Sequence, residues 1–270
     1  MIPTTFPLGR SARVSQHAFF GVSALLFAVS AAMTIAWCTS MSASGAMAMP
    51  GGRTMSAAWM RMPRQTWLAA AASFIAMWVV MMAAMMLPSL VPMLLRYRRA
   101  VGGTGETRLG RLTAIVGAAY FLVWTVFGAA AYPLGIALAG AEMRLPALAR
   151  VAPIAVGMVV SLAGVFQFSA GKTRHLACCR AAPERGVALS ADAATAWRHG
   201  VRLGLHCCYC CGGLIAMLLV IGVMDLRAMA AATAANILER LAPAGERVAR
   251  AIGAVVVAAG LLLIARAAGL

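Results

Sequence analysis

Four cysteines stand within five consecutive residues, directly after His206, in a chain that contains seven cysteines in total. Residues three and four apart share one face of a helix, so Cys207, Cys210 and Cys211 would line one side of it. His206 would lie one turn before Cys210. Thiolates are soft ligands that favour Cu(I) or zinc, and imidazole suits both ions. The pattern predicts a metal site; the alternative is that Cys208 and its neighbours only pack as small apolar side chains.

A second pair, Cys178 and Cys179, precedes this stretch, with His175 nearby. The two segments together offer six thiols and two imidazoles, whereas a closed metal site needs three or four ligands. The sequence does not place the two segments relative to each other, so it leaves open whether they form one site.

Methionines form another sulfur-rich stretch, WVVMMAAMMLPS. On a helix Met82 and Met86 lie one turn apart, as do Met81 and Met85, so their sulfurs stack along one side. Pro88 removes a backbone donor and is expected to bend the helix beside the sulfurs. Cu(I) accepts thioether ligands. Methionine is also an ordinary filler of apolar cores, and spacing alone favours that packing role.

Residues 38–66 form a loop that is also rich in methionine. An exposed loop gives methionine little to pack against, so these sulfurs could collect copper outside the membrane. Alternatively the loop lies on the bilayer, with Trp59 and Trp67 as interface anchors. Both interpretations stay open for this set of methionines: Met41, Met47, Met49, Met55, Met60 and Met62.

Long apolar runs separate these stretches and must position them. Apolar residues make up 63% of the 270 positions and charged residues 11%, against about 25% charged residues in soluble domains. About 20 apolar residues cross the hydrocarbon core as a helix. Six runs are therefore predicted to span the membrane: 18–37, 67–95, 112–138, 151–168, 203–223 and 251–265.

A seventh segment, 224–241, is less apolar and either spans the membrane or lies at its interface. It holds Asn236 and two acidic residues. We interpret Asp225 and Glu239 as interfacial charges beside Arg227 and Arg240, respectively. The predicted fold is an all-α, polytopic integral membrane bundle of six or seven transmembrane helices.

The net charge of +16 is explained by membrane topology rather than by a nucleic-acid partner. With seven spans and a cytoplasmic N-terminus, sixteen basic residues lie inside and seven outside, which is the positive-inside bias. The surplus then faces the anionic inner leaflet. We expect one multi-pass domain with its N-terminus in the cytoplasm. Residues 1–66 would supply the first helix and the Met-rich outer loop, and residues 67–270 the metal-binding helices.

Three stretches resemble the DUF2182 family of bacterial predicted metal-binding membrane proteins, sometimes labelled copper chaperones. They are WVVMMAAMMLPS at 78–89, QFSAGKTRHLACCR at 167–180, and 197–243, which contains GLHCCYCC and ILER. The resemblance covers about residues 67–265 and implies a membrane metal-binding role in a bacterial inner membrane. It implies these candidate ligands: Cys179, Cys207, Cys210, Cys211, Met82, Met85 and Met86. Three further candidates lie outside the family pattern: Cys178, Cys208 and His206.

The sequence therefore predicts a membrane protein that binds Cu(I), with zinc as the alternative ion, for copper handling or delivery. Its partners would be the lipid bilayer, the metal ion and a copper-accepting protein. The competing interpretations are a membrane metalloenzyme or thiol–disulfide oxidoreductase that uses the adjacent cysteines, and a structural subunit. Enzymatic activity is the less favoured of these.

Overall fold

The computed structural model describes residues 10–43, 47–48, 54–55, 59, 65–101, 104–180 and 190–269. The predicted all-α class is confirmed. The only strands in this part of the chain are a two-residue antiparallel pair, β1 (Met47–Ala48) and β2 (Thr54–Met55). The helices are α1 (Arg10–Ala43), α2 (Trp67–Ala100), α3 (Glu106–Arg144), α4 (Pro146–Phe166), α5 (Ala170–Arg180), α6 (Ala193–Ile221), α7 (Leu226–Leu241) and α8 (Gly245–Ala267).

Six of these helices are long and apolar enough to cross a membrane: α1, α2, α3, α4, α6 and α8. Each contains one of the six predicted runs or nearly all of it, as expected for a multi-pass membrane protein. The less apolar segment 224–241 forms α7. Its sixteen residues rise about 24 Å, which is less than the hydrocarbon core of about 30 Å.

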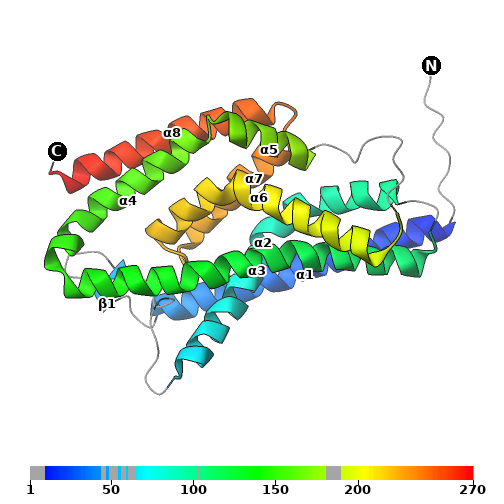
Figure 1. The fold of residues 1–270 in the computed structure, drawn as a ribbon, viewed down its shortest axis with the longest axis horizontal. Helices are drawn as coiled ribbons and strands as arrows, with labels where there is room; N and C mark the ends of the chain where they lie inside the picture. The colour runs from blue at the N-terminus through cyan, green and yellow to red at the C-terminus, as the bar shows by residue number, and fades with distance from the viewer. Residues whose placement is uncertain are drawn as a thin grey trace.

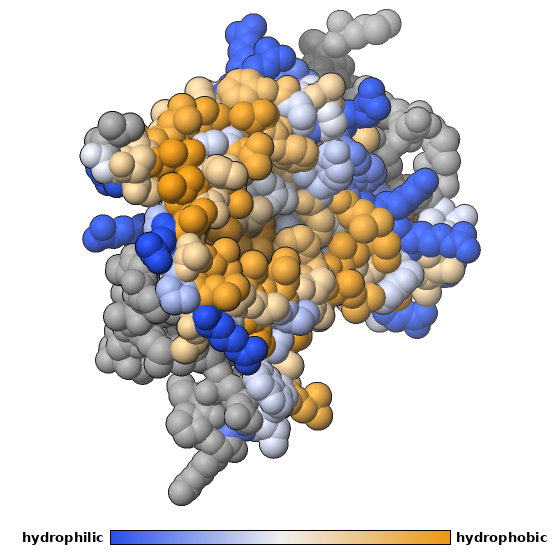
Figure 2. Space-filling view, turned by 60° about the vertical axis from the view of Figure 1, so that its left-hand side comes forward, coloured by the Kyte–Doolittle hydropathy of each residue, from blue (hydrophilic) through white to orange (hydrophobic). Residues whose placement is uncertain are grey.

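Helix α2 forms the centre of the bundle, and the other long helices present apolar side chains to the outside. In its most apolar window 61% of the residues are buried, compared with 17% in α1. Large apolar residues such as Leu68, Leu162, Val255 and Leu262 are exposed. On the face in Figure 2, apolar residues cover much of the surface and hydrophilic side chains lie mainly at its margins. Such a surface suits contact with lipid.

Glycines bring α4 and α8 into close antiparallel contact. A Cβ atom on Gly157 would lie 2.9 Å from the carbonyl oxygen of Gly260, and one on Gly164 2.9 Å from that of Gly253. Small residues at such contacts let membrane helices approach closely. The two helices lie side by side along one edge of the molecule, and α6 and α7 lie between them and α1 and α2, while α4 meets α3 at the turn that joins the two (Figure 1).

A similar contact joins α6 to α3, and here the two helices run parallel. A Cβ atom on Gly200 would lie 2.4 Å from the carbonyl oxygen of Val116, and one on Gly204 3.1 Å from that of Tyr120. This register sets the position of Cys207, which follows Gly204 by three residues, against the side chain of Tyr120.

Two aspartates fix where α6 and α7 begin. Asp192 caps α6 by accepting a hydrogen bond from the backbone N–H of Thr195 at 2.8 Å. Hydrogen bonding to Thr195 lowers the pKa of the Asp192 carboxyl group. Asp225 caps α7 by accepting from the N–H groups of Arg227 and Ala228, at 2.8 and 2.9 Å. The prediction of a charge pair between Asp225 and Arg227 is corrected accordingly, since the aspartate acts as an N-cap.

The close approach of α3 and α6 predicts that Gly200→Ala destabilises the protein. The added methyl group overlaps the backbone of Val116, and overpacking of this kind costs about 1–3 kcal/mol. Gly212→Ala is the matched control on the same helix, because nothing lies within 4 Å of the Cβ position there. Thermal unfolding in detergent should show a lower midpoint for Gly200→Ala alone; equal midpoints would contradict this account of the helix contact.

Candidate metal centre

The cysteine cluster lies in the middle of α6 rather than near its start. We predicted a span from residue 203, but α6 begins ten residues earlier, at Ala193. Cys207, Cys210 and Cys211 are almost fully buried, at 0–1% exposure. Their sulfurs lie close together, with Cys207 Sγ 4.0 Å and Cys210 Sγ 3.7 Å from Cys211 Sγ. The expectation that these three cysteines share one helix face is therefore confirmed.

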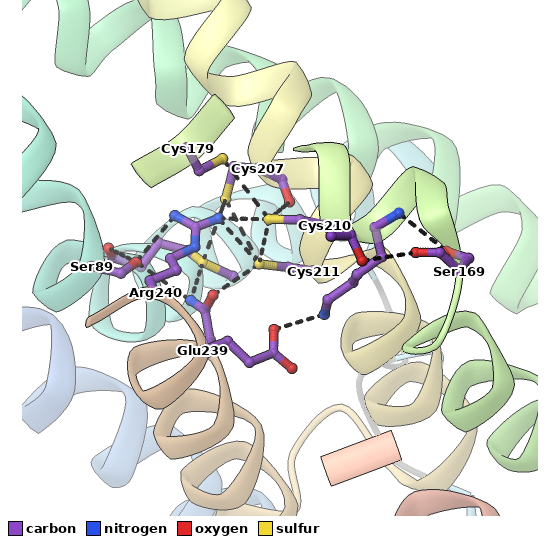
Figure 3. Close-up of polar contacts among 12 residues, drawn as sticks. Ser89, Ser169, Cys179, Cys207, Cys210, Cys211, Glu239 and Arg240 are labelled. Atoms are coloured by element: carbon purple, nitrogen blue, oxygen red, sulfur yellow. Dashed lines mark hydrogen bonds and ion pairs between the residues drawn. The ribbon is translucent and has the colours of Figure 1, made fainter. Parts of the chain in front are cut away.

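Helix α5 adds a fourth thiol to the cluster. The Sγ atom of Cys179 lies 4.0 Å from that of Cys210, so the two cysteine segments that the sequence could not relate do meet (Figure 3). The contact with Cys210 and burial raise the pKa of the Cys179 thiol. Cys178, the next residue along α5, is exposed.

A buried guanidinium group lies among the three thiols of α6. The Nη2 atom of Arg240, on α7, lies 2.8 Å from Cys207 Sγ, 3.1 Å from Cys210 Sγ and 3.3 Å from Cys211 Sγ. Its Nη1 atom lies 3.4 Å from Ser89 Oγ on α2. Figure 3 shows the Arg240 side chain between Ser89 and the cysteines. Arginine donates hydrogen bonds and stays charged in proteins, so these sulfurs accept from a permanent cation.

Neutral polar side chains complete the surroundings of the thiols. Tyr120 Oη lies 2.9 Å from Cys207 Sγ, and the thiol of Cys211 donates to Oδ1 of Asn236 at 2.9 Å. The Nδ2 atom of Asn236 lies 3.3 Å from the sulfur of Met86. Asn236 thus connects the thiols to Met86, whose sulfur lies 4.0 Å from Cys207 Sγ.

The acidic neighbour of Arg240 is buried as well. Glu239 forms an ion pair with Lys172 of α5 at 2.7 Å, and each side chain is 1% exposed. Burial raises the pKa of the Glu239 carboxyl group, while the Lys172 ammonium group opposes that shift. Our interpretation of Glu239 and Arg240 as an interfacial pair was wrong, because adjacent residues on a helix point to different neighbours. The Glu239 side chain reaches Lys172 on α5, and the Arg240 side chain reaches the thiols of α6.

The remaining predicted site residues are divided between the core and the edge of the cluster. Met82 and Met85 are buried in α2 beside Met86, as their packing role predicts. His206 is half-buried, and its Nδ1 atom lies 2.8 Å from Nδ1 of His175. Cys208 is also half-buried. In the loop that we predicted to face outward, the backbones of Met47 and Met55 pair in β1 and β2. Three of its other methionines lie outside the described residues: Met49, Met60 and Met62.

Among the described residues, no group of three or more His, Cys, Asp or Glu side chains is arranged to hold a metal ion as it stands. The donor chemistry fits a soft ion, since three thiols and a thioether meet in a dry interior. What stands among the sulfurs instead is the guanidinium group of Arg240, within hydrogen-bonding distance of all three.

A family model described as PpoB2, copper chaperone, matches residues 75–263. The chain belongs to this copper chaperone family. The match runs from α2 to α8, so all of the thiols and polar groups that surround Arg240 lie within it. No curated protein and no solved structure matches the chain. A family of copper chaperones and a cluster of buried sulfurs agree with a membrane protein that handles copper.

The buried ion pair generates a stability prediction. Lys172 is the only lysine in the chain, and Lys172→Met leaves Glu239 as a buried charge without its ammonium partner. Breaking a buried pair in this way costs about 3–5 kcal/mol. Arg174→Met is the control, since Arg174 is exposed two residues away on the same helix.

The double variant Lys172→Met/Glu239→Leu removes both charges and should recover most of the loss. Denaturant titration of the detergent-purified protein measures these differences. If Lys172→Met and Arg174→Met were equally stable, the ion pair would not contribute to the fold.

Proposed function

We propose that this protein binds Cu(I) through Cys207, Cys210 and Cys211 and delivers the ion to a copper-accepting protein. The distances between the sulfurs carry this proposal. Three donors placed about 2.3 Å from a metal ion in one plane lie about 4 Å from one another. Two of the three separations within the set are 4.0 and 3.7 Å. The thiols therefore need little rearrangement to surround an ion.

The donor set favours copper over zinc. Zinc takes four ligands in a tetrahedron and accepts nitrogen and oxygen readily. Here two further sulfurs lie beside the set, Met86 at 4.0 Å from Cys207 and Cys179 at 4.0 Å from Cys210. Thioethers and thiolates together select Cu(I). The outer methionines, the cytoplasmic N-terminus, the bacterial inner membrane and the DUF2182 label stay predictions from the sequence.

Burial of the thiols speaks against the thiol–disulfide oxidoreductase that the sequence left as an alternative. A redox-active cysteine needs access to its partner, but the three thiols are at most 1% exposed. Forming a disulfide would also require sulfurs now 3.7–4.0 Å apart to approach to about 2.05 Å. Metal binding asks for no such approach, which is why we favour it.

Elemental analysis after loading with Cu(I) or Zn(II) under reducing conditions tests the proposed function. The wild type should retain about one copper per chain after removal of excess ion, and more copper than zinc. The triple variant Cys207→Ser/Cys210→Ser/Cys211→Ser should retain none. The control is Cys38→Ser/Cys178→Ser, which keeps the cluster and changes one cysteine in α1 and one exposed on α5. Wild-type protein that holds no copper would refute the proposal.

Met86 provides a finer prediction. Met86→Leu keeps the volume of the core, so the protein's free energy of unfolding should change by less than about 1.5 kcal/mol. It removes the sulfur beside Cys207 and should weaken Cu(I) binding roughly tenfold, as loss of a supporting group commonly does. Met82→Leu is the matched control, buried one turn away on the same helix. Competition with a Cu(I) chelator measures both affinities; equal values would exclude a role for the Met86 thioether.

A further inference from the structure

We propose that the guanidinium group of Arg240 occupies the copper position in the metal-free protein and must leave it when copper binds. This inference rests on the proposed function, since it concerns the same three thiols. It assigns Arg240 a role opposite to that of a ligand. The residue is a built-in competitor that the incoming ion displaces and that returns when the ion is released.

Geometry makes the two cations mutually exclusive. An ion about 2.3 Å from each of the three sulfurs would lie near the centre of their triangle. The Nη2 atom of Arg240 lies 2.8, 3.1 and 3.3 Å from the same sulfurs. It would then stand only about 2 Å from the ion, given sulfur–metal bonds of about 2.3 Å. A protonated nitrogen has no lone pair with which to bind a metal, so it must withdraw.

Charge explains why a cation stands there at all. In the part of the chain that the structure describes, the buried charged residues are Lys172, Glu239 and Arg240, which together carry one positive charge. The three sulfurs that Arg240 contacts are the acceptors nearest to that charge. A buried charge without a partner is costly, so the guanidinium group and the thiols satisfy each other while no metal is bound.

The end of α7 offers room for the arginine to withdraw. Arg240 lies in the last turn of this helix. Just beyond it, a cavity of about 450 Å³ is lined by Pro243, Glu246 and Leu176, among other residues. Its charged lining residues are Glu246 and Arg247. A small shift of the last turn of α7 therefore moves the guanidinium group away from the sulfurs without requiring a long helix to move.

The exchange has a consequence for affinity. Hydrogen bonds that exist only in the metal-free state oppose metal binding, because they must break before the ion enters. Binding to the wild type is thus weaker than the three thiols alone would give, and the arginine helps to expel the ion during delivery. If Arg240 instead stayed in place to neutralise the copper–thiolate anion, its removal would weaken binding. The two roles therefore predict opposite changes in Cu(I) affinity when Arg240 is replaced.

The experiment compares Cu(I) affinity in the wild type, Arg240→Gln and Arg240→Lys, by competition with a chelator of known affinity in detergent. Charge-assisted hydrogen bonds are strong enough that Arg240→Gln should bind copper on the order of tenfold more tightly. Arg240→Lys keeps a compact positive charge, so its Cu(I) affinity should lie between those of the wild type and Arg240→Gln. Arg227→Gln removes an equal charge from the exposed start of α7 and should leave the affinity unchanged.

Tighter binding by Arg240→Gln, with Arg227→Gln equal to the wild type, supports displacement. Weaker binding by Arg240→Gln overturns it. The increase in unfolding temperature on adding copper is a second readout, expected to be larger for Arg240→Gln than for the wild type.

If neither Arg240 variant folds, the structure of the copper-loaded wild type decides. A guanidinium group still within 3.3 Å of the three sulfurs would refute displacement, and a withdrawn one would support it. Wild-type protein that binds no copper would instead refute the proposed function itself.

Discussion

The need to satisfy one buried positive charge organises the centre of this bundle. Arg240 is 3% exposed and cannot lose its proton in a protein, so its surroundings must supply acceptors in an interior that contains few. Three sulfurs of α6 and the Ser89 hydroxyl group of α2 do so. This explains the short α7, which returns the chain only as far as the level of Cys207. Lys172 and Glu239 neutralise each other beside it.

Close helix contacts hold the three thiols around that charge. Gly200 and Gly204 let the backbone of α6 touch that of α3, which brings Tyr120 against Cys207 at 2.9 Å. On the other side of α6, glycines let the backbones of α4 and α8 touch each other. Small residues matter here because lipid is as apolar as the helix surfaces, so packing rather than water exclusion must hold the helices together.

The sequence could predict whatever depends on local spacing and hydropathy. The six spans and the shared face of Cys207 and Cys211 follow from runs and from the helical period. It could not predict the ten residues that open α6, since Arg198, His199 and Arg202 interrupt the apolar pattern there. It also could not assign Arg240, because its partners lie about 30 and 150 positions away in sequence. A charged pair in an otherwise apolar stretch was the signal, and we interpreted it as interfacial.

A protein that delivers its ion, as we propose for this one, must hold the ion without keeping it, and in that proposal the same atoms meet both demands. Three thiols alone in a dry interior would bind a soft ion tightly and, once empty, would leave a polar cavity that the bundle must collapse or hydrate. A guanidinium group among the thiols would counter both the overly tight binding and the empty polar cavity. In the proposed exchange it keeps the sulfurs about as far apart as an ion requires, and it offers them a substitute partner when the ion departs. The cost of releasing the ion is thereby lowered by an interaction within the protein itself.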